Sequence, residues 1–95
     1  MLFHVAITVR VPHGEDPEKI RQRGVLEHER AAELQRQGKW LHLWRVAGKW
    51  ANIGVFKVDD PAELHAILES LPPYSYMETE VVALCRHPGS LSQVD

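Results

Sequence analysis

Residues 2–11 of the chain alternate between a mixed set of side chains, at the even-numbered positions, and a second set at the odd-numbered positions. One set is entirely apolar and mostly β-branched, namely Phe3, Val5, Ile7, Val9 and Val11. This period of two predicts a β-strand with one buried face. Two further strands are expected over residues 40–46 and 52–58, joined by a hairpin turn at 47–49. A last extended run covers residues 76–84.

Two helices are expected between these strands. Asp16 followed by Pro17 has the form of an N-cap and first helical residue, and Gly38 supplies a C-terminal stop, so a helix of about 20 residues should lie between them. Asp60-Pro61 repeats the capping pattern, and Pro72-Pro73 must end the second helix.

The resulting order β-α-β-β-α-β predicts an α+β protein of the ferredoxin-like βαββαβ type, in which an antiparallel sheet carries two helices on one face. A single domain is expected over residues 1–95, because so short a chain buries only about 60 to 65% of its unfolded surface. Apolar residues occur on both faces of several strands. We therefore expect the uncovered face to pack against another subunit in a homo-oligomer.

Composition removes several classes of function. The net charge is −2, with 11 Lys+Arg against 13 Asp+Glu scattered along the chain, so no nucleic-acid partner is expected. No apolar stretch approaches the roughly 20 residues that span a bilayer, so we expect no membrane partner. The single cysteine, Cys85, cannot form an intrachain disulfide, and the alternating N-terminus does not resemble a signal peptide. A cytoplasmic location is expected.

Glu27 stands out on the first predicted helix because it falls within an apolar stripe. At about 100° per residue, the stripe occupies a sector of roughly 80° and consists of Ile20, Gly24, Glu27, Ala31 and Leu34. An unpaired carboxylate in such a place costs several kcal/mol, so it must be paired, neutralised or held in a pocket as an acid or base. The structural alternative is a buried ion pair with Arg45.

Arg45 lies in a predicted strand interior, on the side of Leu41 and Leu43. A guanidinium there is expected to meet an anion, either Glu27 or the carboxylate of a ligand. Aromatic residues flank the same strands and could offer flat surfaces to a small ring, although most should belong to the core; they are Trp40, Trp44, Trp50, Tyr74 and Tyr76.

No metal site or cofactor is expected. The six histidines show neither a HExxH pattern nor zinc-finger spacing, and the chain has no P-loop or dinucleotide fingerprint. His4 and His42 lie at strand positions and could approach a pocket, although a hydrogen-bonded core histidine is the commoner outcome. No neighbouring residue in the sequence would activate Cys85 as a nucleophile.

Four segments along the chain resemble the muconolactone Δ-isomerase family: MLFHV, LQRQGKWLHLWRVAGKWAN, LHAILESLP and LCRHPGS. The resemblance covers essentially the whole chain, and its central segment is the most distinctive. It implies a cofactor-independent enzyme of the bacterial β-ketoadipate pathway, which converts muconolactone to the 3-oxoadipate enol-lactone. It also implies a small-molecule lactone substrate and assembly into a homodecamer.

For such a reaction Glu27 is the expected catalytic base, because a carboxylate in a partly apolar pocket is suited to taking and returning a proton. Arg45 would bind the acetate arm of the substrate, and Asn52, His4 or backbone amides would donate to the lactone oxygen. The remaining expected substrate contacts are the aromatic residues Trp40, Trp50 and Tyr76.

The sequence departs from the family pattern near Glu27. Gly24 stands where lysine is common, and Trp50 where tyrosine is usual. Arg21 or Arg23 could supply the missing charge from another direction. Three alternatives stay open: a dehalogenase acting on a chlorinated muconolactone, a divergent lactone isomerase, and a non-catalytic oligomer that binds a small acid.

Overall fold

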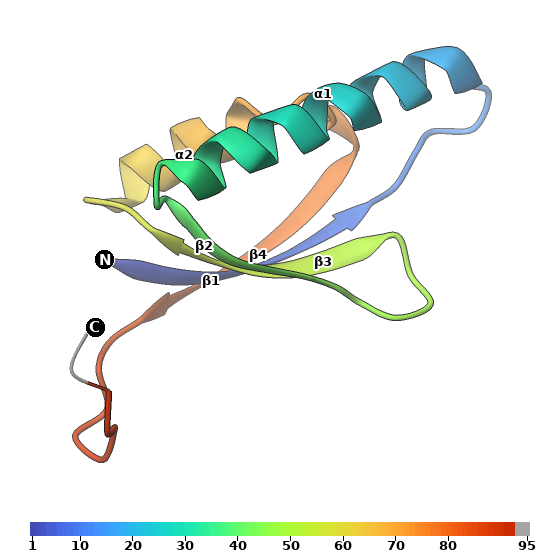
Figure 1. The fold of residues 1–95 in the computed structure, drawn as a ribbon. Coiled ribbons are helices and arrows are strands. Elements are labelled where there is room, and N and C mark those ends of the chain that lie inside the picture. Colours follow the sequence, from blue (N-terminus) through green and yellow to red (C-terminus); the bar gives the residue numbers. More distant parts are fainter. Residues whose placement is uncertain (93–95) are drawn as a thin grey trace.

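The fold follows the predicted order of strands and helices (Figure 1). The computed structural model describes residues 1–92. Its elements are β1 (Leu2–Val9), α1 (Pro17–Arg36), β2 (Trp40–Arg45), β3 (Ala51–Lys57), α2 (Pro61–Glu69), a short 3-10 helix (Tyr74–Tyr76) and β4 (Met77–Leu84). The predicted α+β class is confirmed. The 3-10 helix was not predicted, and β1 ends two residues earlier than the alternation suggested.

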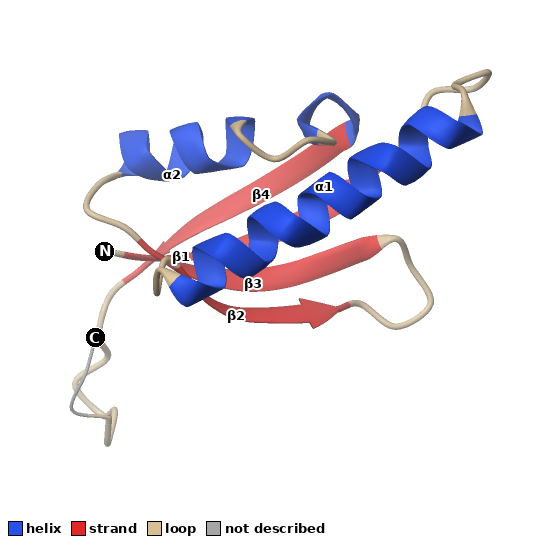
Figure 2. Cartoon of the chain, turned by 45° about the horizontal axis from the view of Figure 1, so that its top comes forward, coloured by secondary structure: helices blue, strands red, loops and turns tan. Residues whose placement is uncertain are grey.

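The four strands form one antiparallel sheet in the order β2-β3-β1-β4. Both helices lie on the same face of this sheet, with α1 crossing it obliquely (Figures 1 and 2). The strand order leaves β2 and β4 as the edge strands of the sheet.

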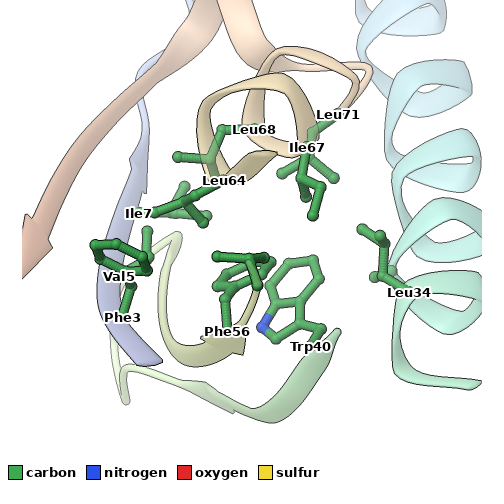
Figure 3. Packing of buried hydrophobic residues seen from close by; sticks show 12 residues of the cluster. Phe3, Val5, Ile7, Leu34, Trp40, Phe56, Leu64, Ile67, Leu68 and Leu71 are labelled. Atoms are coloured by element: carbon green, nitrogen blue, oxygen red, sulfur yellow. The ribbon is translucent and has the colours of Figure 1, made fainter. Parts of the chain in front are cut away.

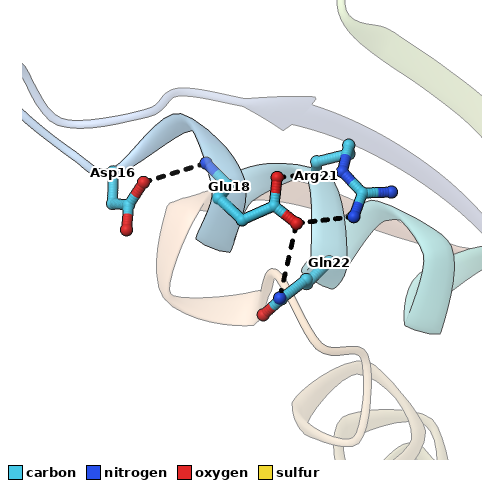
Figure 4. Close-up of polar contacts among 4 residues, drawn as sticks. All are labelled: Asp16, Glu18, Arg21 and Gln22. Atoms are coloured by element: carbon cyan, nitrogen blue, oxygen red, sulfur yellow. Dashed lines mark hydrogen bonds and ion pairs between the residues drawn. The ribbon is translucent and has the colours of Figure 1, made fainter.

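Side-chain capping fixes where the helices start. Asp16 accepts a hydrogen bond from the Glu18 backbone N–H at 3.0 Å (Figure 4), and Asp60 accepts one from the Glu63 N–H at 2.8 Å. These bonds satisfy N–H groups that have no partner inside the helix. After α1 the chain turns at Gly38, whose φ of 73° lies in the left-handed region that glycine adopts without strain.

The hydrophobic core lies between the sheet and the helices (Figure 3). Trp40 and Phe56 form its centre, with stacked rings whose centroids are 4.6 Å apart. From α1, Ala31 and Leu34 are buried against this core, whereas no residue of α1 before Ala31 is fully buried. The C-terminal half of α1 therefore anchors the helix, and its N-terminal half is free to border a pocket.

An irregularity in β2 decides which face Trp40 occupies. Trp40 is paired with Phe56 but His42 with Val55, so the register shifts between the two residues. In a regular strand, residues two apart lie on the same face of the sheet. A bulge between two such residues places them on opposite faces. Trp40 consequently enters the core, while His42 stacks on Trp44 on the opposite face, with ring centroids 5.2 Å apart.

Both helices lie on one face of the sheet, and no helix of residues 1–92 lies over the other face (Figure 1). That other face carries apolar side chains. It includes the exposed residues Trp44, Val82 and Leu84, together with Ile53 and Val55. We call this set the outer sheet face. No helix in the described part of the chain is long and apolar enough to cross a membrane.

Candidate active site

A pocket lies between the N-terminal half of α1 and one end of the sheet. Antiparallel pairing brings the end of β1, the end of β2 and the starts of β3 and β4 to this same end. The cavity measures about 90 Å³, enough for several water-sized groups. Its walls come from every strand and from α1, and they are lined by Ile7, Val9, Ile20, Arg23, Gly24, Glu27, His28, Arg45, Trp50, Ala51, Asn52, Pro73, Tyr76 and Met77.

The strand register places two polar residues in this pocket. Asn52 is paired with Ile7 on one side and with Arg45 on the other. Directly opposed residues share a face of the sheet, and Ile7 is buried beneath the helices. Asn52 and Arg45 therefore point toward the helix layer, where α1 crosses above them.

Glu27 faces them from α1, as its place in the apolar stripe predicted. Only 20% of its side chain is exposed. Burial raises the pKa of the Glu27 carboxyl, and the charges of His28 and Arg45 oppose that rise. The basic side chain nearest to it is that of His28, whose Nε2 lies 4.0 Å from the Glu27 carboxylate. A carboxyl whose neutral form is favoured by its surroundings is suited to accept and return a proton.

Arg45 is close enough to Glu27 to affect its charge but makes no ion pair with it or with any other residue in 1–92. Arg45 was predicted in a strand interior, but it is the last residue of the edge strand β2 and is exposed. A second hollow adjoins the pocket there and shares Glu27, His28, Arg45 and Asn52 with it. The guanidinium is thus available to an anionic ligand.

Arg23 is the second cation of the pocket. Its Nη1 donates a hydrogen bond to the Tyr76 hydroxyl, and its guanidinium carbon lies 4.8 Å from the centroid of the Tyr76 ring. Arg21, the other arginine considered from the sequence, points elsewhere and is paired with Glu18 at 2.5 Å (Figure 4). The structure therefore places Arg23, and not Arg21, beside the pocket.

Trp50 and Asn52 complete the polar and aromatic lining. Half of Trp50 remains exposed at the pocket rim. The Asn52 Oδ1 atom is buried without a hydrogen-bond partner among the described residues. Because an asparagine amide can be turned about its axis, this group can offer a ligand either a donor or an acceptor.

Two residues expected at the site lie outside this pocket. Trp40 is 1% exposed in the core against Phe56, because of the irregularity in β2. His4 is paired with Val55 and Val82, which places it on the outer sheet face. The pocket of this chain therefore contains Glu27, Arg45, Asn52, Trp50 and Tyr76 but neither Trp40 nor His4.

Sequence reasoning missed one wall of the pocket, formed by Pro73 and Met77. These residues flank the short 3-10 helix, whose only signal was the pair of prolines before it. It also gave no role to His28, which follows Glu27 in the chain, lines the pocket and has its Nε2 4.0 Å from the Glu27 carboxylate. No group of three or more His, Cys, Asp or Glu in residues 1–92 is arranged to hold a metal ion.

Known proteins match the chain along its length. The family model described as muconolactone delta-isomerase matches residues 1–90. Muconolactone Delta-isomerase 2 of Acinetobacter lwoffii is 47% identical over 95 residues, covering 100% of this chain and 99% of that protein. Muconolactone Delta-isomerase of Pseudomonas putida is likewise 47% identical over the same shares.

Solved structures give the same result. A crystal structure of muconolactone isomerase superposes with a TM-score of 0.94 at 49% identity, covering 100% of this chain and 99% of that one. A dehydrochlorinase of 5-chloro-2-hydroxyhydroquinone from Burkholderia phenoliruptrix has a TM-score of 0.59 at 17% identity, covering 92% and 96%, which indicates a shared fold only. With full-length identity near one half and a matching pocket-bearing fold, the chain belongs to the muconolactone delta-isomerase family.

Proposed function

We propose that this protein isomerises muconolactone to the 3-oxoadipate enol-lactone by a 1,3-proton shift, with Glu27 as the proton shuttle. The observation that carries the proposal is the largely buried position of the Glu27 carboxyl, which has only His28 within 4.0 Å as a basic neighbour in the described chain, in a pocket that also holds Arg45 and Asn52. Family membership supplies the substrate class, since the relatives carry the name of this reaction.

Each step of the reaction has a matching group. The Glu27 carboxylate takes the proton from the ring carbon that bears the acetate arm, and the C–H electron pair moves through the ring double bond onto the lactone carbonyl oxygen. The protonated Glu27 then returns the proton to the carbon α to that carbonyl. No atom is gained or lost, and a single base performs both transfers.

Substrate orientation falls to the groups around Glu27. Arg45 can hold the acetate carboxylate with two parallel hydrogen bonds, because its guanidinium is free of an ion pair within the described chain. Asn52 can donate a further hydrogen bond to a lactone oxygen, and Trp50 and Tyr76 offer flat walls to the ring. A fixed acetate arm places the reacting carbon within reach of the base.

We further propose that the active protein is a homo-oligomer, as the uncovered outer sheet face and the short chain both favour association. A decamer is the size that the family resemblance implies.

The test is an ultraviolet assay of the purified protein with muconolactone, run beside its 5-chloro analogue with a chloride electrode. Conversion of muconolactone without any added metal or cofactor supports the proposal. Release of chloride from the analogue, with no turnover of muconolactone, would assign the pocket to the dehalogenase reaction instead. Binding of both lactones without turnover of either would favour the non-catalytic role.

A further inference from the structure

The substrate carries negative charge in two places during the proposed reaction, and the pocket is lined by two arginines, Arg23 and Arg45. The acetate arm is anionic throughout, whereas the lactone carbonyl oxygen becomes anionic only while Glu27 holds the proton. Arg45 accounts for the first of these. The carbonyl oxygen needs a donor of its own, because charge that develops in the transition state is stabilised best by a group already in position.

Arg23 occupies the right part of the pocket for that task. It lies four residues, or about one helical turn, before Glu27 on α1, so the two side chains are neighbours on the helix surface. Arg23 borders the pocket together with Pro73 and Tyr76, whereas Arg45 also borders the adjoining hollow, which Arg23 does not reach. The two cations therefore approach the space beside Glu27 from different sides.

The Arg23 side chain is also held in place. Tyr76 accepts a hydrogen bond from Nη1 and lies beneath the guanidinium, and the Glu15 carboxylate is 3.9 Å from the same nitrogen. Only 36% of the Arg23 side chain is exposed, against 66% for Arg21 two residues earlier. A guanidinium has five N–H donors, and the contacts to residues in the described chain involve Nη1, so donors remain for a ligand.

We propose that Arg23, oriented by Tyr76, binds the lactone carbonyl oxygen and stabilises the dienolate that forms when Glu27 removes the proton. The inference rests on the proposed isomerase function. It gives the two arginines separate duties: Arg45 recognises the acetate arm, and Arg23 recognises the oxygen whose charge changes during the reaction.

The test uses tetronate, a five-membered enol lactone that is an anion at neutral pH and has no acetate arm. Its dissociation constant is measured through tryptophan fluorescence in the full-length protein and in Arg23→Met, Arg45→Met and Arg21→Met. We expect Arg23→Met to weaken tetronate binding by about tenfold or more, since a charge-assisted contact is lost. Arg45→Met should change it far less, and Arg21→Met, the matched control, should leave it unchanged.

Kinetics with muconolactone give the second readout. Arg23→Met should lower kcat by about 10² to 10³-fold, the usual effect of removing one donor to a developing oxyanion, whereas Arg45→Met should chiefly raise KM. Arg23→Lys should recover part of the rate, because it keeps the charge and loses the planar fork. Tyr76→Phe, which keeps the ring but loses the hydroxyl, covers the case in which Arg23→Met fails to fold, and should reduce kcat several-fold.

The outcomes separate the two proposals. A folded Arg23→Met protein that binds tetronate as well as the unaltered protein does, or an unaltered protein that does not bind tetronate, would overturn the role of Arg23. An unaltered protein that binds tetronate through Arg23 but does not convert muconolactone would overturn the proposed isomerase function and leave the anion site standing.

Discussion

The Glu27 carboxyl is in an environment that disfavours its charged form, because burial outweighs the attraction of His28 and Arg45. Its pKa in the folded protein is therefore above that in the unfolded chain. A raised pKa means that the folded state binds the proton more tightly, so the contribution of Glu27 to stability is full below the unfolded pKa. It is lost as the pH rises through the folded value.

From this sign we predict that Glu27→Gln raises the melting temperature at pH 7 to 8, since the amide does not carry the charge that burial penalises. The gain should shrink below pH 4.5, the ordinary value for a glutamate, where the carboxyl is protonated in both states. Differential scanning calorimetry at several pH values measures the difference in melting temperature between Glu27→Gln and the unaltered protein. Glu29→Gln, which replaces an exposed carboxylate of the same helix, is the control and should not raise the melting temperature in this way.

The same substitution should abolish turnover. Glu27→Gln keeps the shape of the side chain but removes the basic oxygen, and loss of a general base lowers kcat by about 10² to 10⁴-fold. The assay is steady-state kinetics on muconolactone, with circular dichroism to show that the fold is intact. A stable variant with near-normal kcat would show that another group, such as His28, moves the proton.

The face on which a side chain lies could be predicted from the sequence only where a regular periodicity determines it. Helix periodicity alone predicts that Glu27 lies on the sheet-facing side of α1, and in the structure Glu27 lines the pocket on that side. The side of Trp40 depends on the register shift in β2, which alternation cannot reveal. His4 and Ile7 are three residues apart on β1, so they face opposite sides, and a count from the buried Ile7 would have removed His4 from the pocket.

At the scale of elements, the β2–β3 hairpin is the part that positions Arg45 and Asn52, and it depends on a close approach at Gly54. A Cβ added there would lie 2.4 Å from Trp40 Nε1 and 3.0 Å from the His42 carbonyl oxygen. Trp40 is buried against Phe56 and cannot move aside without disturbing the core.

We therefore predict that Gly54→Ala destabilises the protein by about 1 to 3 kcal/mol, as overpacking of a close-packed core usually does. Gly24→Ala is the matched control, because a Cβ there meets nothing within 4 Å and alanine favours the helix by about 0.5 to 1 kcal/mol. Urea denaturation of both variants measures the difference. Equal stability of the two would show that the hairpin tolerates a wider separation at Gly54.

The elements themselves were predictable because their signals are local. Asp16 and Asp60 cap the two helices as expected, and the chain turns at Gly48 with a φ of 79°. The 3-10 helix at Tyr74–Tyr76 was not predicted, since its position depends on packing after α2 ends and not on any periodic pattern. The pocket wall that it carries was missed for the same reason.

At the scale of the whole molecule, no helix of residues 1–92 lies over the outer sheet face. A patch of adjacent apolar side chains on a small protein marks an interaction surface, and the family resemblance favours other copies of the chain as the partner. Val82 lies on this face opposite His4, with 53% of its surface exposed. An acidic side chain there would be desolvated in any interface that covers the sheet.

We predict that light scattering of the unaltered protein reports an oligomer and that Val82→Glu shifts it to smaller species, because burying an unpaired charge costs several kcal/mol. Val25→Glu is the matched control: Val25 is 49% exposed on α1, away from the sheet, and its substitution should leave the assembly intact. Circular dichroism of both variants separates dissociation from unfolding. If Val25→Glu dissociates the protein and Val82→Glu does not, the helix layer forms the subunit contact, and the outer sheet face must then be exposed to water in the assembled protein.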